Sequence, residues 1–402
     1  MISSVKIIKT VYGGDGMGRL GDGRVVFVPG AFAGEQVKAE IVTEKKNFVK
    51  ARLIEFEETS PHRISTGDVP VPGAVFWNIS FKGECEAKGS QLQDFFDRAR
   101  IKLPSPVKAM PSGPSDDTCA LNYRNKVIYR FAMRGKTPIM GYLKEPTHEI
   151  IDMPQDPLAV HEINENLPKI RESVFRLLTT GPMAVRKHIE RKETVTIRYA
   201  ARSGLAWWVG EAPKDVVLKE ATCNKRFDVP SDGFYQINSK VGEALVKSVV
   251  SRFNISPTSE VVDLYCGVGV FGLCMSPKKL IGIESGRRAV EFAKLNAKSN
   301  NFENAKFFAG QAARELHRFS ANSDTTIVVD PPRGGLERKV AETLSRSAAS
   351  RIFYVSCDPA TLMRDLRILS SSYEVIDVEW FNMFPRTARF ETLVVLRKKN
   401  SK

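Results

Sequence analysis

The sequence lacks several features that would assign it to common protein classes. It has no run approaching about 18 uncharged apolar residues, and its first residues, MISSVKIIKTVYGG, contain no apolar core of signal-peptide length. Its six cysteines include no CxxC pair, which argues against a disulfide framework and against a zinc site. We therefore expect a cytoplasmic protein with reduced thiols, no membrane segment and no bound metal.

Acidic residues are fewer than basic ones. Sixty Lys and Arg stand against 46 Asp and Glu, for a net charge of +14. Such an excess favours a polyanionic partner, although a merely soluble basic protein would explain the charge alone equally well. Apolar residues make up 42% of the 402 residues, which is enough for two or three packed domains.

The chain divides into three parts by its residue pattern. Residues 1–58 alternate short β-type runs with glycine turns, which predicts a small OB-like β-barrel, either an oligonucleotide-binding module or a simple appended one. Residues 59–230 mix helical and strand patterns, which predicts an α+β middle domain. Residues 231–402 alternate strands with helices, which predicts a Rossmann-like α/β domain with a mostly parallel sheet.

The third part contains a glycine-rich loop. VVDLYCGVGVFG at 261–272 ends a predicted strand and brings Gly267 and Gly269 close to a ligand at the carboxyl edge of the sheet. The next predicted strand ends at Glu284, whose carboxylate would accept hydrogen bonds from a ribose. Both features also suit an NAD enzyme. DPPR at 330–333 argues against an NAD enzyme, because a dehydrogenase does not need a carboxylate followed by two prolines at this position.

Two further residues have reactive side chains. RIFYVSCDPATLMRDL places Cys357 between a predicted strand and a helix whose N-terminal dipole would favour a thiolate, although an isolated cysteine is usually a buried thiol. Glu391 begins the last predicted strand and matters only if the sheet brings it beside Cys357. For Asp330 the alternative is a helix cap.

Cys357, Asp330 and Glu391 together suit methylation at C5 of uracil. A thiolate that adds to C6 makes C5 nucleophilic enough to attack a methyl sulfonium. The adduct then loses its C5 proton to a base such as Glu391. Asp330 would accept a hydrogen bond from the ring N3–H, which uracil has and cytosine lacks.

Four segments, VVDLYCGVG, VVDPPRGG, FYVSCDPATLMRDL and MFPRTARFETL, resemble the RNA uracil-5 methyltransferase family in order and spacing, and residues 1–58 resemble its TRAM domain. The resemblance implies a class I S-adenosylmethionine-dependent enzyme that forms 5-methyluridine in RNA, ribosomal RNA before transfer RNA; we expect a monomer. Cys357 is then the nucleophile, Glu391 the base and Asp330 a cleft carboxylate. The implied cofactor contacts are Gln236, Tyr265, Gly267, Gly269, Glu284, Gln311 and Asp330.

The chain departs from this family in two places. Many members carry a four-cysteine iron–sulfur site, and the four positions here are Ser65, Val71, Ala74 and Asp156. No thiolate remains at any of them, so we expect no cluster. A histidine is usual two residues before the base, where this chain has Arg389. The change adds a fixed positive charge that could grip a phosphate or hold Glu391.

RNA contacts are expected on the first two parts, with the target uridine unpaired or flipped out of its stack. Aromatic residues that could stack on bases, but more often pack in cores, are Trp77, Tyr123, Trp207 and Trp208. Basic residues that would form either a phosphate track or a solvated surface are Arg186, Lys187, Arg191, Lys192, Arg198 and Arg202.

Two other functions remain open. An RNA cytosine-5 methyltransferase would use the same thiolate addition, although Asp330 and the pairing of Cys357 with Glu391 favour uracil. A non-catalytic RNA-binding or ribosome-assembly factor would keep the fold without the chemistry, and the departure at Arg389 and the missing cysteines are consistent with it.

Overall fold

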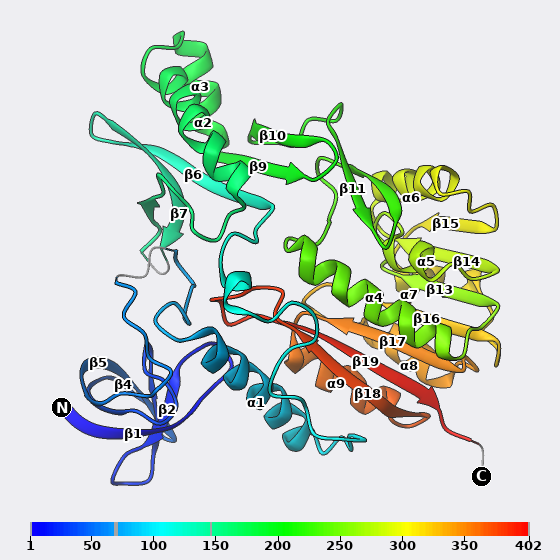
Figure 1. Ribbon diagram of the computed structural model, residues 1–402, viewed down its shortest axis with the longest axis horizontal. Helices are drawn as coiled ribbons and strands as arrows, with labels where there is room; N and C mark the ends of the chain where they lie inside the picture. Colours follow the sequence, from blue (N-terminus) through cyan, green and yellow to red (C-terminus); the bar gives the residue numbers. More distant parts are fainter. Residues whose placement is uncertain (1, 68–70, 145–146, 401–402) are drawn as a thin grey trace.

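The computed structural model describes residues 2–67, 71–144 and 147–400, except for the side chains of 188–192. An N-terminal barrel and a five-stranded middle sheet lie on one side of the molecule, and a seven-stranded sheet with its helices lies on the other (Figure 1). The α/β fold class with a preceding barrel is confirmed. Within the described residues, no helix combines the length and apolar character that a membrane span requires.

The N-terminal part is a closed barrel with strand order β1-β2-β3-β5-β4. Its strands are β1 (Ile2–Thr10), β2 (Gly16–Arg19), β3 (Val25–Val28), β4 (Gln36–Glu44) and β5 (Phe48–Glu58). Alternate residues such as Val5 and Ile7 point into a small apolar core. Gly18 is required because a Cβ there would lie 2.5 Å from the carbonyl oxygen of Lys6 on the neighbouring strand.

The middle part is a sheet of order β10-β9-β6-β7-β8 with helix α2 packed on one face. Its elements are β6 (Lys126–Arg134), β7 (Thr137–Lys144), β8 (Glu149–Asp152), α2 (His161–Thr179), α3 (Met183–Lys192), β9 (Thr194–Ala200) and β10 (Gly204–Val209). In α2, Ile163, Leu167, Ile170 and Val174 recur at helical spacing and are buried. The hairpin of β11 (Val217–Thr222) and β12 (Lys225–Pro230) leads to the last part.

The C-terminal sheet has the order β15-β14-β13-β16-β17-β19-β18. Its strands are β13 (Glu260–Leu264), β14 (Lys279–Glu284), β15 (Ala305–Ala309), β16 (Thr325–Val329), β17 (Arg351–Ser356), β18 (Tyr373–Phe381) and β19 (Glu391–Lys398). The first five run parallel, while β19 is antiparallel to both β17 and β18. The prediction of a mostly parallel sheet is therefore confirmed.

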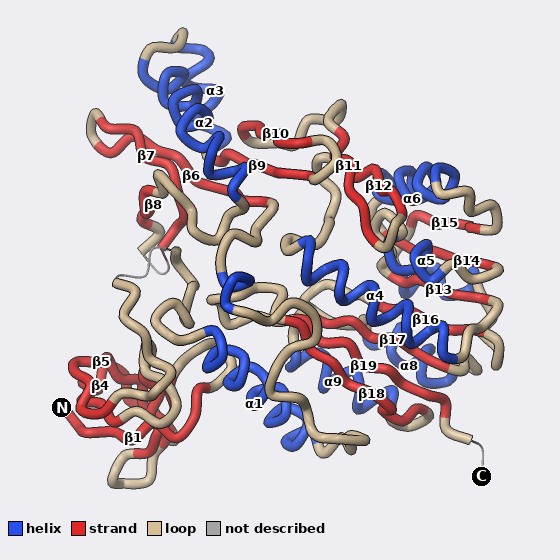
Figure 2. The backbone as a smooth tube through the Cα atoms, viewed as in Figure 1, coloured by secondary structure: helices blue, strands red, loops and turns tan. Residues whose placement is uncertain are grey.

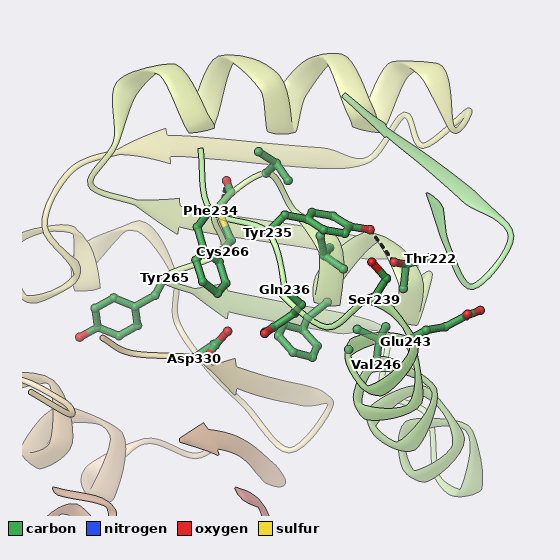
Figure 3. A pocket seen from close by; sticks show the side chains of 15 residues that line it. Thr222, Phe234, Tyr235, Gln236, Ser239, Glu243, Val246, Tyr265, Cys266 and Asp330 are labelled. Atoms are coloured by element: carbon green, nitrogen blue, oxygen red, sulfur yellow. Dashed lines mark hydrogen bonds between the residues drawn. The ribbon is translucent and has the colours of Figure 1, made fainter. Parts of the chain in front are cut away.

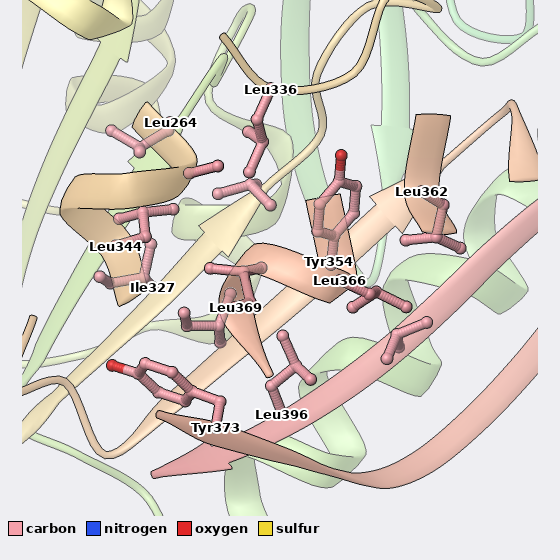
Figure 4. Close-up of a cluster of buried hydrophobic side chains, with 14 of the residues drawn as sticks. Leu264, Ile327, Leu336, Leu344, Tyr354, Leu362, Leu366, Leu369, Tyr373 and Leu396 are labelled. Carbon is pink, nitrogen blue, oxygen red and sulfur yellow. The ribbon is translucent and has the colours of Figure 1, made fainter. Parts of the chain in front are cut away.

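Helices cover both faces of this sheet (Figure 2). They are α4 (Ser239–Ile255), α5 (Val270–Met275), α6 (Arg287–Ser299), α7 (Ala312–Glu315), α8 (Arg338–Arg346) and α9 (Pro359–Leu369), with a 3₁₀ turn at Leu316–Arg318. Strand residues alternate between the two cores, so that Ile352 and Tyr354 face α8 and α9 while Phe353 and Val355 face the opposite core. Figure 4 shows the α8–α9 core, in which leucines of both helices surround Tyr354.

Helix α1 (Phe81–Ala99) joins this core although it precedes the middle sheet in the chain. Phe81, Cys85, Leu92 and Phe96 are buried with α8 and α9 side chains, and a 3₁₀ turn at Asp117–Ala120 follows the helix. In Figure 1, α1 lies between the barrel and β18. Residues 59–230, which the sequence predicted as one middle domain, thus contribute both to the core of the middle sheet and to the core of the C-terminal sheet.

A buried polar network connects α1 to the turn that precedes β19. Glu84 and Lys88 are both fully buried and lie 2.7 Å apart. Lys88 Nζ also donates to Asn382 Oδ1 at 2.7 Å, and the backbone N–H of Arg386 donates to the Glu84 carboxylate at 3.0 Å. Arg386 has φ +68°, so these bonds hold a strained turn in place.

We predict that Lys88→Met lowers the free energy of unfolding by about 3–5 kcal/mol, because it leaves the Glu84 carboxylate buried without its cation. Urea denaturation followed by circular dichroism measures the change. The control is Lys82→Met, which removes an exposed partner of Glu86 at the same spacing on the same helix and should cost at most about 1 kcal/mol. Equal losses of unfolding free energy in the two variants would show that the buried pair stabilises the fold no more than an exposed pair does.

Candidate active site

A cleft of about 740 Å³ opens at the carboxyl edge of the C-terminal sheet. Loops after β13, β14, β15, β16 and β17 and the start of β19 line it, as expected for a ligand site in a doubly wound sheet. Its lining includes the predicted residues Gln236, Tyr265, Gly267, Glu284, Gln311, Asp330, Cys357 and Glu391. The volume is that of a site for a small-molecule ligand.

The cofactor half of the cleft is built from the loops after β13 and β14. Gly267 has φ +54°, and a Cβ there would meet no other atom within 4 Å. The Glu284 carboxylate accepts hydrogen bonds from the backbone N–H groups of Gly267 at 3.2 Å and Gly286 at 2.7 Å. In the described part of the chain it has no cationic partner, so it can still accept hydrogen bonds from ribose hydroxyls. These residues fit an adenosine-bearing cofactor.

A smaller hollow of about 50 Å³ adjoins this half of the cleft. Figure 3 shows Gln236 and Asp330 on facing segments there, with the Tyr235 hydroxyl in a 2.5 Å hydrogen bond to Thr222. Phe234, which the sequence analysis did not single out, lines both spaces and is 69% exposed. An exposed aromatic ring at a cleft mouth can stack on a base or on the cofactor.

Sheet register brings the two reactive side chains together. In the antiparallel pair β17–β19, Ser356 is paired with Thr392, so the adjacent residues Cys357 and Glu391 meet across the strands. Both line the cleft with Asp330. Glu391 is 5% exposed, and its Oε2 atom has no hydrogen-bond partner among the described residues. A buried carboxylate with a free oxygen can accept a proton from a substrate.

Burial and the charge of Asp330 alter the protonation of the other reactive groups in the cleft. Burial raises the pKa of Asp330 to about 7, and burial together with the Asp330 charge raises the pKa of Glu391 well above its usual value. Burial, Glu391 and Asp330 raise the pKa of the Cys357 thiol to about 12. The expected thiolate-favouring helix dipole is therefore overridden. Its helix terminus is already capped, because Asp358 Oδ1 accepts from the N–H groups of Ala360 and Thr361.

Arg333 supplies a positive charge on the cleft wall, and the sequence did not indicate it as a site residue. It lines the cleft in the DPPR segment, and its charge opposes the rise in the pKa of both Cys357 and Glu391. Lys126, at the start of β6, also lines the cleft and was not anticipated. Asp330 does not cap a helix, since the N-cap of α8 is Glu337.

Several expected contacts lie elsewhere. Gly269 does not line the cleft; it begins α5 with φ +89°, and a Cβ there would come within 3.1 Å of Leu273. Among the aromatic candidates, Tyr123 and Trp208 are largely buried, whereas Trp207 is 37% exposed. Trp77 packs against the middle-domain core. These positions favour core packing for most of the aromatic set.

The expected basic cluster is divided. Arg198 is buried and donates to the carbonyl oxygens of Ser231 and Gly233, so it is not part of a surface phosphate track. Arg202 and Lys187 are exposed and Arg186 is half-buried. The side chains of Arg191 and Lys192 lie outside the described part of the structure.

The positions expected for iron–sulfur ligands serve the middle-domain core instead. Val71 and Ala74 are buried among its apolar side chains, and Ser65 is exposed. Asp156 is buried and accepts hydrogen bonds from the hydroxyls of Tyr129 at 3.0 Å and Tyr142 at 2.7 Å. Over the described ranges, no group of three or more His, Cys, Asp or Glu side chains is placed to hold a metal ion.

Comparisons with known proteins agree with this geometry. Residues 213–399 match the family model for tRNA (uracil-5-)-methyltransferases, and residues 4–54 match that for the TRAM domain. Uncharacterized RNA methyltransferases of Halalkalibacterium halodurans and Thermotoga maritima are each 28% identical to the chain. The alignments cover 99% of this chain in both cases, and 97% and 99% of the respective relatives.

A solved structure has the same fold over the whole chain. It is the Pyrococcus abyssi tRNA (uracil-54, C5)-methyltransferase in complex with S-adenosyl-L-homocysteine. The TM-score is 0.72 at 20% identity, over 98% of this chain and 100% of that one.

The fold and the cleft thus define a class I methyltransferase, the class that uses S-adenosylmethionine. Residues 213–399 match the tRNA (uracil-5-)-methyltransferase domain, and a TRAM domain at residues 4–54 precedes it.

We predict that Asp330→Asn stabilises the fold at alkaline pH. The pKa of Asp330 is about 7 in the folded protein against 3.8 as its ordinary value, so ionising the buried carboxyl costs stability as pH rises from about 4 to about 8. Asparagine removes that cost, so the gain should be below about 1 kcal/mol at about pH 4 and on the order of 4 kcal/mol at about pH 8, at about 1.4 kcal/mol for each pH unit between the two pKa values. Thermal denaturation across this range measures it.

The matched control is Asp215→Asn, which changes an exposed carboxylate outside the cleft. A gain for Asp330→Asn that does not depend on pH, or that the control shares, would contradict the assignment of a buried charge.

Proposed function

We propose that the protein forms 5-methyluridine in RNA, with ribosomal RNA as the first candidate substrate. The observation that carries the proposal is the meeting of Cys357 and Glu391 across the β17–β19 pair, in the cleft that Asp330 also lines. A nucleophile, a base and a base-reading carboxylate are the groups that methylation at C5 requires. The TRAM domain at the N-terminus favours a ribosomal target.

Transfer RNA is the second candidate. The matching family model and the Pyrococcus abyssi structure both carry transfer RNA in their names. In either RNA the target uridine has to leave its stack, because C5 and C6 are shielded within a helix.

The cofactor would be held by the carboxyl edge of β13 and β14. S-adenosylmethionine, when bound, supplies an electrophilic methyl group. Gln236, Tyr265, Gly267, Glu284 and Gln311 would line its site, with Glu284 accepting from the ribose hydroxyls. Phe234 at the mouth would cover the site and limit access of water.

Cys357 begins the reaction. Its thiolate sulfur bonds to C6 of uracil, and the C5–C6 π electrons move toward O4. C5 would then take the methyl group that bound S-adenosylmethionine supplies, and the electrons of the broken S–CH3 bond would remain on the cofactor sulfur. The Arg333 guanidinium favours the thiolate against the neighbouring carboxylates.

Glu391 completes the reaction. Its free Oε2 takes the proton from C5, and the electrons of that C–H bond restore the C5–C6 double bond and expel the Cys357 sulfur. The raised pKa of Glu391 makes it a stronger base than an exposed glutamate. Asp330, when ionised, accepts from the uracil N3–H, and cytosine offers no such donor.

We expect variants of the two reacting residues to fail at different steps. Cys357→Ala should form neither product nor a covalent RNA complex. Glu391→Gln should accumulate a covalent complex with ordinary RNA, because the methylated adduct keeps its C5 proton. Wild-type protein should be trapped only on RNA that contains 5-fluorouridine. In this nucleotide fluorine replaces the hydrogen at C5, so the base has no proton to remove from the adduct. Denaturing gels with labelled RNA separate these outcomes.

The RNA target is tested by mapping 5-methyluridine in ribosomal and transfer RNA from cells with and without the protein. Loss of one ribosomal position supports the first candidate, and loss of a transfer-RNA position supports the second. Appearance of 5-methylcytidine in the purified reaction would instead indicate a cytosine-5 methyltransferase. A wild-type protein that binds RNA but is never trapped would indicate a non-catalytic RNA-binding factor.

A further inference from the structure

Arg389 lies on the rim of the cleft between two parts of the chain that are far apart in sequence. Its Nη1 atom donates to the hydroxyl of Tyr12 at 2.8 Å and to Asp358 Oδ2 at 3.1 Å. Tyr12 follows the first strand of the barrel, whereas Asp358 directly follows Cys357. Arg389 lines the same cleft as Cys357 and Glu391, and its side chain is 37% exposed.

The guanidinium is held at one nitrogen only. Among the described residues, no partner accepts from its Nε or Nη2 atoms, so most of its donors remain open. Arginine presents five N–H donors in a planar fork that matches two oxygens of a phosphate. A fixed guanidinium with open donors on a cleft rim is suited to bind such an anion.

Both groups that hold Arg389 are themselves held. The second oxygen of Asp358 caps α9 through the N–H groups of Ala360 and Thr361. The Tyr12 ring packs edge-on against Phe95 at 5.6 Å and Phe390 at 5.9 Å between ring centroids. Burial raises the pKa of Tyr12, so its phenol stays neutral and can accept from Arg389.

The barrel is anchored at this point. Gln91 of α1 donates to the carbonyl oxygens of Thr10 and Val11 at 3.0 and 3.1 Å, and Lys9 forms an ion pair with Asp94. These contacts fix the segment that leads to Tyr12, so that the barrel contributes the side chain that contacts Arg389 at the cleft.

We propose that Arg389 binds the phosphate on the 5′ side of the target nucleotide, with Tyr12 as its positioning residue. In a nucleotide with the usual anti base, the C6 edge of the pyrimidine faces its own 5′-phosphate. Since Cys357 is to attack C6, the groups beside Cys357 lie on that side, and Asp358 holds Arg389 there. The assignment rests on the proposed RNA substrate but not on methyl transfer.

Equilibrium binding tests this assignment without turnover. The full-length protein carries Cys357→Ala in all samples, and the probe is a fluorescein-labelled 12-nucleotide oligouridine titrated at several KCl concentrations. We expect Arg389→Gln to weaken binding about tenfold and to reduce the slope of log K against log[KCl] by about 0.7, the value for one phosphate contact on a single strand. Arg389→Lys should restore the slope, because it restores the charge.

The matched control is Arg397→Gln, near the far end of β19, the strand that follows Arg389, where the arginine pairs with exposed Glu374. It should change neither affinity nor slope. Tyr12→Phe should weaken binding while leaving the slope as in the parent, because the charge remains but is no longer held. Wild-type affinity in Tyr12→Phe would overturn the part assigned to the barrel.

Binding of S-adenosylhomocysteine is measured in parallel by calorimetry. Unchanged cofactor affinity in Arg389→Gln shows that the cleft is intact and supports the RNA phosphate as the ligand. A loss confined to the cofactor would overturn the proposal, because the arginine would then bind the cofactor carboxylate. An unaltered salt slope would also overturn it. If the salt slope depends on Arg389 but the wild-type protein forms no 5-methyluridine, the proposed function is refuted and the phosphate contact is not.

Discussion

The antiparallel pairing of β19 with β17 is the constraint on which the active site depends. Strands β13 to β17 run parallel to one another, and their carboxyl ends supply the loops around the cleft. Because β19 runs in the opposite direction, its first residue, not its last, lies at that edge. Glu391 is therefore placed across from Cys357, and a shift of one residue would turn its side chain to the opposite face of the sheet.

This pairing needs support from outside the sheet, because a tight turn precedes β19. Helix α1 provides that support through the buried Glu84–Lys88 pair and its bonds to Asn382 and Arg386. The same helix holds the barrel through Gln91. One helix thus fixes both the turn that leads to the base and the module that reaches the rim of the cleft.

The cleft gathers more negative charge than a stable core would tolerate. The Asp330 charge raises the cost of ionising Glu391, and both carboxylates disfavour the Cys357 thiolate. Arg333 is the cation that opposes this repulsion at the thiol. Perturbed pKa values of several groups in one cleft are typical of catalytic sites.

Much of the fold and of the site follows from the sequence alone. Period-two and helical patterns are local, so they identify the barrel, the mixed middle part and the parallel strand–helix units. Short motifs likewise indicate the glycine loop, Glu284, Asp330 and Cys357, because strand ends of a parallel sheet share one edge. Glu391 could be proposed as the base only on a condition, because the sequence does not show where in the sheet the last strand inserts. The side chain reaches Cys357 only if that strand lies beside β17.

Tertiary structure decided what depends on distant parts of the chain. It placed Glu391 opposite Cys357, joined Tyr12 to Arg389, moved Gly269 out of the cleft and buried Arg198. It also reversed the expected effect on the thiol, because burial and carboxylates from other strands outweigh a capped helix terminus. The reason is physical: burial and electrostatic fields are sums over neighbours in space, whereas a motif reports only neighbours in sequence.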